Sequence, residues 1–294
     1  MWQQLKIAAG PESAETIEDA LLTLGAAAVT FEDAADQPLY EPPRGELPLW
    51  QQTRVTALFD ADCDTSLVMA ALSNELGWSE LPSHQSEILE DRDWVRAWMD
   101  DFKPIKFGQR LAICPSWHTP EDDGMTHIML DPGLAFGTGT HPTTALCLQW
   151  LDGVDCENQL VIDYGCGSGI LGIAALLLGA KQLIAVDNDP QALQATADNC
   201  GRNQIDSQRV SCHLPEQTPP NIQAPLVLAN ILAGPLQSLA PVLSKLTQSG
   251  GDLVLSGILE TQCEAVFDAY RADFEQVDTR IKDGWARLHL RKMA

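Results

Sequence analysis

VIDYGCGSGILG, residues 161–172, is an apolar run that passes through closely spaced glycines into a helical pattern. Gly165, Gly167 and Gly169 allow the backbone to turn tightly and to come close to a bound ligand. The first turn of the helix that follows has amide groups without a partner inside the helix. The stretch therefore predicts a strand, a glycine turn and a helix that together bind a nucleotide-like cofactor.

From about residue 158 onward, apolar runs alternate with helical segments. We expect strands at 160–164, 183–187, 209–214, 225–230 and 252–258, helices at 170–178, 190–199 and about 233–247, and a closing hairpin of 274–281 and 285–292. Continuous apolar strands between helices are typical of a parallel sheet that is covered on both faces. This part of the chain is therefore predicted to be a doubly wound α/β domain.

The N-terminal part has a different pattern. Strands are expected at 2–8, 27–33, 53–59 and 84–90, and helices at 12–24 and 64–76. This order is that of a ferredoxin-like sandwich. Because it contains no pocket-forming motif, we interpret residues 1–90 as a substrate-recognition domain. Residues 91–124 are interpreted as a linker helix (91–103, with an aromatic stripe) and a connecting segment, and residues 125–294 as the cofactor-binding domain.

Composition narrows the classes of function. The 294 residues include 18 Lys and Arg and 41 Asp and Glu, a net charge of −23. Such a chain is repelled by phosphate backbones, which disfavours direct nucleic-acid binding and favours a basic partner. The chain has no apolar run long enough for a membrane helix, and we expect no N-terminal secretory signal. Its eight cysteines lack zinc-binding spacing, so we expect reduced thiols in a cytoplasmic protein and no metal site.

Two cofactor classes compete for the glycine turn. Gly167, Gly169 and Gly172 can be aligned to the dinucleotide fingerprint G-x-G-x-x-G. Against this reading, Asp163 places a negative charge beside the position of a pyrophosphate. Asp187 also lies closer to Gly172 than the acidic residue of that fingerprint, which follows by about 20 residues. A cationic, phosphate-free cofactor, S-adenosylmethionine, fits better.

The carboxylate at the end of the second strand has a specific use in this interpretation. Asp187 can accept hydrogen bonds from the ribose hydroxyls of S-adenosylmethionine. The alternative role of a helix cap is already filled by Asp189, which directly precedes Pro190. Asp187 is therefore a candidate cofactor ligand.

Further candidates lie at the end of a strand and at the start of a helix. Asn230 ends the strand 225–230, where its amide can accept a hydrogen bond from a nucleophilic N–H and orient the lone pair. In DPGLAFGTGTHPTT, residues 131–144, the hydroxyls of Thr143 and Thr144 can hold the carboxylate of the cofactor or simply cap a helix. Spacing alone favours the helix cap. His141 is a candidate general base by proximity in sequence only, and a structural role is favoured.

Three motifs together suggest a family. DPGLAFGTGTHPTT, VIDYGCGSGILGIAAL and ANILAGPL, in this order behind an acidic α/β module, resemble the bacterial ribosomal protein L11 methyltransferases, and the resemblance covers essentially the whole chain. It implies a seven-stranded class I methyltransferase domain behind a smaller substrate-recognition domain. It also implies S-adenosylmethionine-dependent methylation of the α-amino group and lysine side chains of a basic ribosomal protein of the large subunit.

The resemblance assigns residues as well. It implies that Thr144, Gly165, Asp187 and Asn230 bind the cofactor and that Asn230 is catalytic. Enzymes that methylate nucleic-acid bases or glutamine have Asn-Pro-Pro-Tyr where this chain has Asn-Ile-Leu-Ala at 230–233. The stacking tyrosine is missing, which disfavours a planar base or amide as substrate.

Other functions remain open at the level of the sequence. One is a lysine or amine methyltransferase with another basic substrate, and a second is a nicotinamide-dependent dehydrogenase. A third is an acidic module that binds a basic protein without catalysis. For the favoured function we expect a monomer that acts on its substrate before ribosome assembly, because the acidic chain is repelled by ribosomal RNA.

Overall fold

The structure is a computed structural model, which describes residues 1–35, 37, 48–89, 103–131 and 141–294. Contacts divide the chain into two compact units, Met1–Ala97 and Trp98–Ala294. The helix expected at 91–103 lies outside the described residues except for its last position, and so does most of the 131–144 motif. No helix in the described ranges combines the length and the apolar character needed to cross a membrane.

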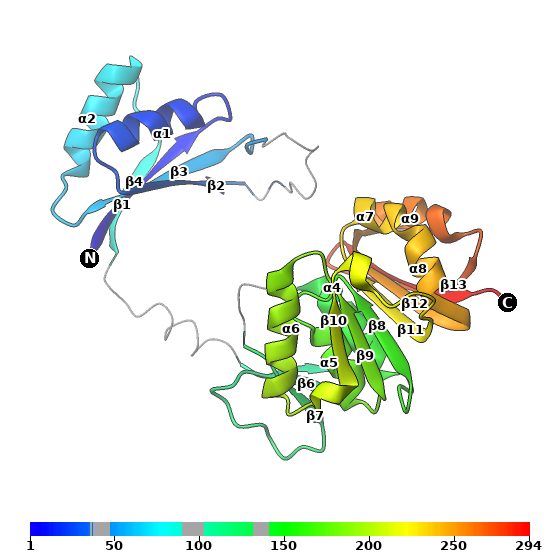
Figure 1. Cartoon of the computed structure of the whole chain (residues 1–294). Coiled ribbons are helices and arrows are strands. Elements are labelled where there is room, and N and C mark those ends of the chain that lie inside the picture. The colour runs from blue at the N-terminus through cyan, green and yellow to red at the C-terminus, as the bar shows by residue number, and fades with distance from the viewer. Residues whose placement is uncertain (36, 38–47, 90–102, 132–140) are drawn as a thin grey trace. The chain divides into compact units, whose positions relative to one another are not determined.

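The smaller unit is a four-stranded antiparallel sheet with two helices. Its elements are β1 (Trp2–Ala9), α1 (Ala14–Thr23), β2 (Ala28–Asp33), β3 (Thr53–Asp60), α2 (Thr65–Leu76) and β4 (His84–Leu89). The strand order is β2-β3-β1-β4, and α1 and α2 cover one face of the sheet (Figure 1). Asp64 begins α2 by accepting a hydrogen bond from Ser66 N at 2.9 Å. The ferredoxin-like prediction is confirmed.

The larger unit contains a mixed sheet of seven strands in the order β10-β9-β8-β11-β12-β14-β13. The strands are β8 (Leu160–Tyr164), β9 (Gln182–Val186), β10 (Val210–His213), β11 (Ala224–Asn230), β12 (Thr247–Leu259), β13 (Phe274–Lys282) and β14 (Trp285–Lys292). The first five strands of the order are parallel, and β14 runs antiparallel to both of its neighbours. This arrangement confirms the predicted seven-stranded class I methyltransferase domain.

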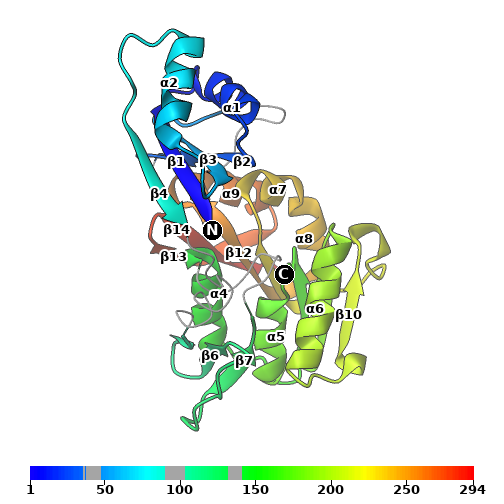
Figure 2. The same ribbon diagram turned by 90° about the vertical axis from the view of Figure 1, so that its left-hand side faces the viewer.

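Helices cover both faces of this sheet. Three of them, α4 (Pro142–Asp152), α5 (Ile170–Leu177) and α6 (Pro190–Arg202), lie side by side on one face (Figure 2). The others, α7 (Ala233–Ser238), α8 (Ala240–Leu246) and α9 (Cys263–Tyr270), pack on the opposite face (Figure 1). Each layer of helices buries its own apolar cluster against the sheet.

Some elements differ from expectation. The helix predicted at about 233–247 is two helices, because Pro241 lacks the N–H that would continue the first helix into the second. Helix α9 was not predicted. Strands β5 (Ile105–Phe107) and β6 (Leu111–Cys114) pair with each other, and β6 pairs with β7 (Thr126–Met129), in a separate three-stranded sheet. Strand β5 was not predicted, and β5 and β6 lie in the segment interpreted from the sequence as a linker.

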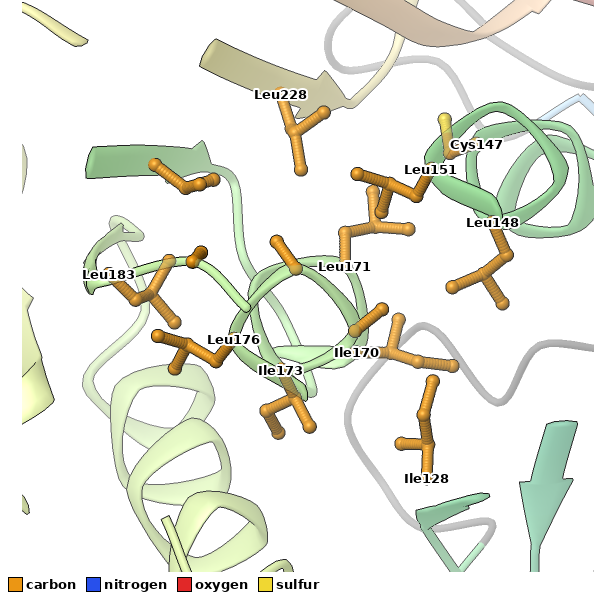
Figure 3. Packing of buried hydrophobic residues seen from close by; sticks show 14 of the residues in the cluster. Ile128, Cys147, Leu148, Leu151, Ile170, Leu171, Ile173, Leu176, Leu183 and Leu228 are labelled. Carbon is orange, nitrogen blue, oxygen red and sulfur yellow. The ribbon is translucent and has the colours of Figure 1, made fainter. Parts of the chain in front are cut away.

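The helix after the glycine turn is the most deeply buried helix in the core. Figure 3 shows α5 surrounded by apolar side chains from α4, β7, β9 and β11, and every residue from Ile170 to Leu176 is buried. A Cβ atom at Gly172 would lie 2.5 Å from Leu183 Cδ2, so a larger residue would displace this buried side chain where α5 crosses β9. This packing fixes the position of the glycine turn at the end of β8.

Candidate active site

A cavity of about 570 Å³ opens at the carboxyl ends of β8, β9 and β11. The glycine turn, the residues after β9 and the segment that follows β11 form its walls, and Trp285 of β14 contributes an aromatic side. A crevice at this edge of a doubly wound sheet is the usual position of a ligand site. The structure brings Gly165, Asp187 and Asn230 to this one cavity, although they lie far apart in the sequence.

The glycine turn is held in a conformation that other residues rarely adopt. Gly165, Gly167 and Gly169 have φ angles of 75°, 54° and 78°. The amides of Gly165 and Cys166 both donate to Val186 O, at 2.7 and 3.1 Å, which ties the turn to the end of β9. A Cβ at Gly165 would lie 2.3 Å from Ile231 Cγ2. The turn therefore packs directly against Ile231, and a larger residue at Gly165 would collide with that side chain.

Asp187 supports the turn and also faces the cavity. Its Oδ2 accepts a hydrogen bond from Gly167 N at 2.9 Å, and its Oδ1 accepts one from Asp189 N at 3.0 Å. A carboxylate offers about four lone-pair sites, so acceptor capacity remains for hydroxyl groups of a ligand. Asp189 caps α6 by accepting from Gln191 N at 2.8 Å, which confirms that the capping role belongs to Asp189.

The charge of Asp163 differs from the one expected from the sequence. Its side chain is 1% exposed, and its Oδ2 accepts a hydrogen bond from Gly172 N at 2.9 Å. The pKa of Asp163 is raised to about 7, mainly by burial; the Gly172 hydrogen bond opposes the rise, and the nearby charge of Asp187 adds to it. The assumption that Asp163 presents a full negative charge is therefore corrected, because the group is partly protonated at neutral pH and joins β8 to the first turn of α5.

The pKa of Asp163 leads to a pH-dependent stability. In the unfolded chain the group loses its proton near ~3.9, so the folded state binds the proton more tightly. The stability that this tighter proton binding contributes is fully present below about pH 4 and is lost as the pH rises through 7. When the pH is raised from 5 to 8, we expect the free energy of unfolding of the parent chain to fall by about 2–3 kcal/mol more than that of Asp163→Asn, which has no carboxyl group to titrate at this position. Urea unfolding of both chains at pH 5 and pH 8 measures this change. The same difference in unfolding free energy between variant and parent chain at both pH values would contradict the prediction.

Asn230 and Thr144 are neighbours at the edge of the sheet. Asn230 Nδ2 donates to Thr144 Oγ1 at 3.2 Å, and Asn230 Oδ1 is buried without a hydrogen-bond partner among the described residues. Thr144 is fully buried and does not line the cavity, whereas Thr143 does. The cofactor role expected for Thr144 stays a prediction, and the contact that the structure gives its hydroxyl is one that orients the amide of Asn230.

His141 caps the helix that follows the 131–144 motif. Its Nδ1 accepts a hydrogen bond from Thr143 N at 3.3 Å and lies 2.7 Å from Thr143 Oγ1, while its ring meets Trp285 edge-on with centroids 4.7 Å apart. Burial lowers the pKa of His141, so the ring is neutral at pH 7. The cap and the ring contact are structural roles, as favoured from the sequence, although the residue also lines the cavity.

Trp285 and Gly257 are among the residues of the site that were missed in the sequence. Trp285 reaches the cavity only because β14 inserts between β12 and β13, and no motif indicates that pairing. Gly257 has a φ of 86°, and a Cβ there would lie 2.4 Å from Ile231 O, directly after Asn230. A glycine inside the apolar run 252–258 was the available signal, since such glycines often mark a close approach of backbones.

The close approach at Gly257 can be tested by substitution. We expect Gly257→Ala to displace the backbone at Ile231 and to lower methyl transfer by tenfold to about 100-fold, since reacting groups tolerate little misplacement. Gly250→Ala is the matched control, because Gly250 lies in the same strand with a φ of 74° and has open space around it. Equal activity of the two variants in a methyl-transfer assay would contradict this role for Gly257.

Among the described residues, no group of three His, Cys, Asp or Glu side chains is arranged to hold a metal ion. The polar groups that line the cavity are the carboxyl groups of Asp163 and Asp187, the side-chain amides of Asn188 and Asn230 and backbone amides, next to apolar side chains. Such a site suits an organic ligand with hydroxyl and amino groups.

Comparison with known proteins agrees with these features. The family model described as ribosomal protein L11 methyltransferase (PrmA) matches residues 1–293. Proteins named ribosomal protein L11 methyltransferase from Pseudomonas putida strain F1 and Pseudomonas syringae pv. tomato are 54% and 55% identical, over 99% and 98% of both chains. The crystal structure of ribosomal protein L11 methylase from Lactobacillus delbrueckii subsp. bulgaricus matches with a TM-score of 0.59 and 30% identity, covering 66% of this chain and 100% of that chain.

Proposed function

Because this chain belongs to the ribosomal protein L11 methyltransferase family, we propose that it transfers methyl groups at the cavity beside the glycine turn. The enzyme is an S-adenosylmethionine-dependent protein N-methyltransferase, and ribosomal protein L11 is its substrate. The observation that supports this location most strongly is the buried Oδ1 of Asn230, which has no hydrogen-bond partner among the described residues and lies in the same cavity wall as the glycine turn. A buried acceptor without a donor costs about 1–3 kcal/mol, which a ligand N–H would recover.

The residues of the cavity fit S-adenosylmethionine. Asp187 has acceptor capacity for two ribose hydroxyls, and the cavity that Gly165 and Asp187 both line has room for an adenosyl group close to the backbone of the turn. Asn230 and the first turn of α4 are proposed to complete the site, with Thr144 acting through its contact with Asn230. When bound, the cofactor supplies an electrophilic methyl group on a sulfonium.

The proposed role of Asn230 is to align the attacking amine. Its Oδ1 accepts a hydrogen bond from the amine N–H, which points the nitrogen lone pair away from the amide. The Thr144 hydroxyl accepts from Asn230 Nδ2 and thereby fixes which way the amide faces. Alignment of reacting groups in this way can supply several kcal/mol of the rate enhancement.

The amine must be neutral when it reacts. An α-amino group, with a pKa of ~7.7–8.0, loses its proton readily, whereas a lysine near ~10.4 requires about 4–5 kcal/mol at pH 7. Ile231, Leu232 and Trp285 give the cavity an apolar side, and such surroundings favour the neutral form of an amine. We therefore propose that both the α-amino group and lysine side chains are methylated, with the α-amino group needing less assistance.

The charge of the chain supports a basic substrate that is free in solution. A net charge of −23 attracts a basic ribosomal protein and repels ribosomal RNA. We propose a monomeric enzyme that acts in the cytoplasm before the substrate joins the ribosome. Methylation is expected to be at least about tenfold faster on free ribosomal protein L11 than on intact ribosomes at low salt. Equal initial rates on the two substrates would contradict this.

The amine specificity can be tested by mass spectrometry of the substrate. After incubation with S-adenosylmethionine, we expect methyl groups on the α-amino group and on lysines of ribosomal protein L11. Acetylation of the α-amino group should abolish only the first of these. A second basic ribosomal protein serves as the control for specificity, and equal methylation of that protein would favour the alternative of a general amine methyltransferase.

A further inference from the structure

A second cavity, of about 560 Å³, lies between helix α4 and the β13–β14 hairpin. It shares no lining residue with the cavity described above. Side chains of Leu146 and Trp150 from α4 form one wall, and Arg280, Lys282 and Arg287 from the hairpin form the other. Nothing in the methyl-transfer reaction uses these residues.

The cations of this cavity are placed in an arrangement that is costly without an anion. Arg280 and Arg287 are directly opposite each other in the antiparallel pairing of β13 with β14. Like charges in such a pair are destabilising. One carboxylate, Asp278, lies near both, 2.8 Å from Arg287 Nη1 and 3.8 Å from Arg280 Nε. With Lys282 the cavity thus holds three cations and one anion, in a chain whose net charge is −23.

Arg287 is the buried member of this group. Its side chain is 3% exposed and lines the cavity, and its Nε is buried without a hydrogen-bond partner among the described residues. A guanidinium presents its donors in a planar fork that matches the oxygens of a carboxylate or phosphate. Asp278 accepts a hydrogen bond from only one of these donor groups, Nη1.

We propose that this cavity binds a small oxyanion, a phosphate or carboxylate group, between Arg280, Lys282 and Arg287. The oxyanion balances the two opposed arginines and gives Arg287 the acceptors that Asp278 does not supply. The apolar side of the cavity, formed by Leu146 and Trp150, receives the carbon part of an aromatic or aliphatic carboxylate if the ligand has one. The site is independent of the methyl-transfer function.

The test is calorimetric titration of the full-length protein, in a buffer without oxyanions, with inorganic phosphate and separately with benzoate. We expect saturable binding of at least one probe at one site per chain. Binding of phosphate alone assigns the ligand to phosphate compounds, and binding of benzoate alone assigns it to apolar carboxylates. The absence of saturable binding of both probes would overturn the proposal.

Variants distinguish specific binding of the anion in the cavity from general attraction by positive charge. Arg280 is 71% exposed, so Arg280→Gln with Lys282→Gln is compatible with folding and avoids the buried Arg287. This double variant is expected to raise the dissociation constant at least about tenfold. Arg271→Gln with Lys245→Gln removes the same charge from outside the cavity and should leave the constant unchanged. Equal weakening in the two variants would show non-specific attraction and overturn the proposal.

Discussion

Asp187→Ala is expected to weaken binding of S-adenosylmethionine by about 100-fold or more. The variant removes a charged acceptor from two ribose hydroxyls, and each such hydrogen bond contributes about 1.5–3 kcal/mol. It also removes the acceptor for Gly167 N, so a part of the loss reflects a less ordered glycine turn. Calorimetric titration of the cofactor into the parent chain and the variant measures the change.

A control and a second ligand distinguish these two causes. Asp189→Ala removes the neighbouring carboxylate, which caps α6, and should cost about 1 kcal/mol of stability while leaving cofactor affinity nearly unchanged. With a cofactor analogue that lacks the ribose hydroxyls, the difference in affinity between the parent chain and Asp187→Ala should shrink to the part that the less ordered glycine turn contributes. If Asp189→Ala weakened binding as much as Asp187→Ala, a specific role of Asp187 would be contradicted.

Asn230→Ala is expected to lower kcat by about 100- to 1000-fold with little change in KM for ribosomal protein L11. The amide is proposed to align the amine in the transition state, and loss of such alignment or of one oriented hydrogen-bonding group costs about this much. Asn230 does not belong to the N-terminal unit, which we propose recognises the protein substrate, so we expect that recognition to be retained. Steady-state kinetics with free ribosomal protein L11 separate the two parameters.

The neighbour of Asn230 provides a graded control. Thr144→Val removes the hydroxyl that accepts from Asn230 Nδ2 and should reduce kcat less than Asn230→Ala does. Thr144→Ser restores that acceptor and should recover most of the activity. Kinetics of Asn230→Ala that match those of the parent chain would contradict the proposed placement of the amine.

The sequence predicted those parts of the site that depend on local chain features. The glycine turn, Asp187 at the end of β9 and Asn230 at the end of β11 each follow an apolar strand, and parallel strands bring their ends to one edge. The fold of both units was predicted for the same reason, since the order of strands and helices restricts the possible topologies.

Features that depend on tertiary contacts were not predictable in this way. Trp285 reaches the cavity through the antiparallel insertion of β14, and Gly257 is needed because Ile231 approaches it from a different strand. The partly protonated state of Asp163 depends on its burial, which the sequence does not give directly. Spacing also favoured a capping role for Thr144 and gave no sign of its contact with Asn230, because that contact joins residues that are far apart in the chain.

The central claim is that the glycine turn after Tyr164 holds an adenosyl group whose sugar is bound by Asp187. A crystal structure of the chain soaked with S-adenosylmethionine tests this claim most directly. The account predicts both ribose hydroxyls within hydrogen-bonding distance of the Asp187 carboxylate, with the sulfonium methyl directed toward Asn230. A cofactor bound with its sugar away from Asp187, or in another cavity, would contradict the account.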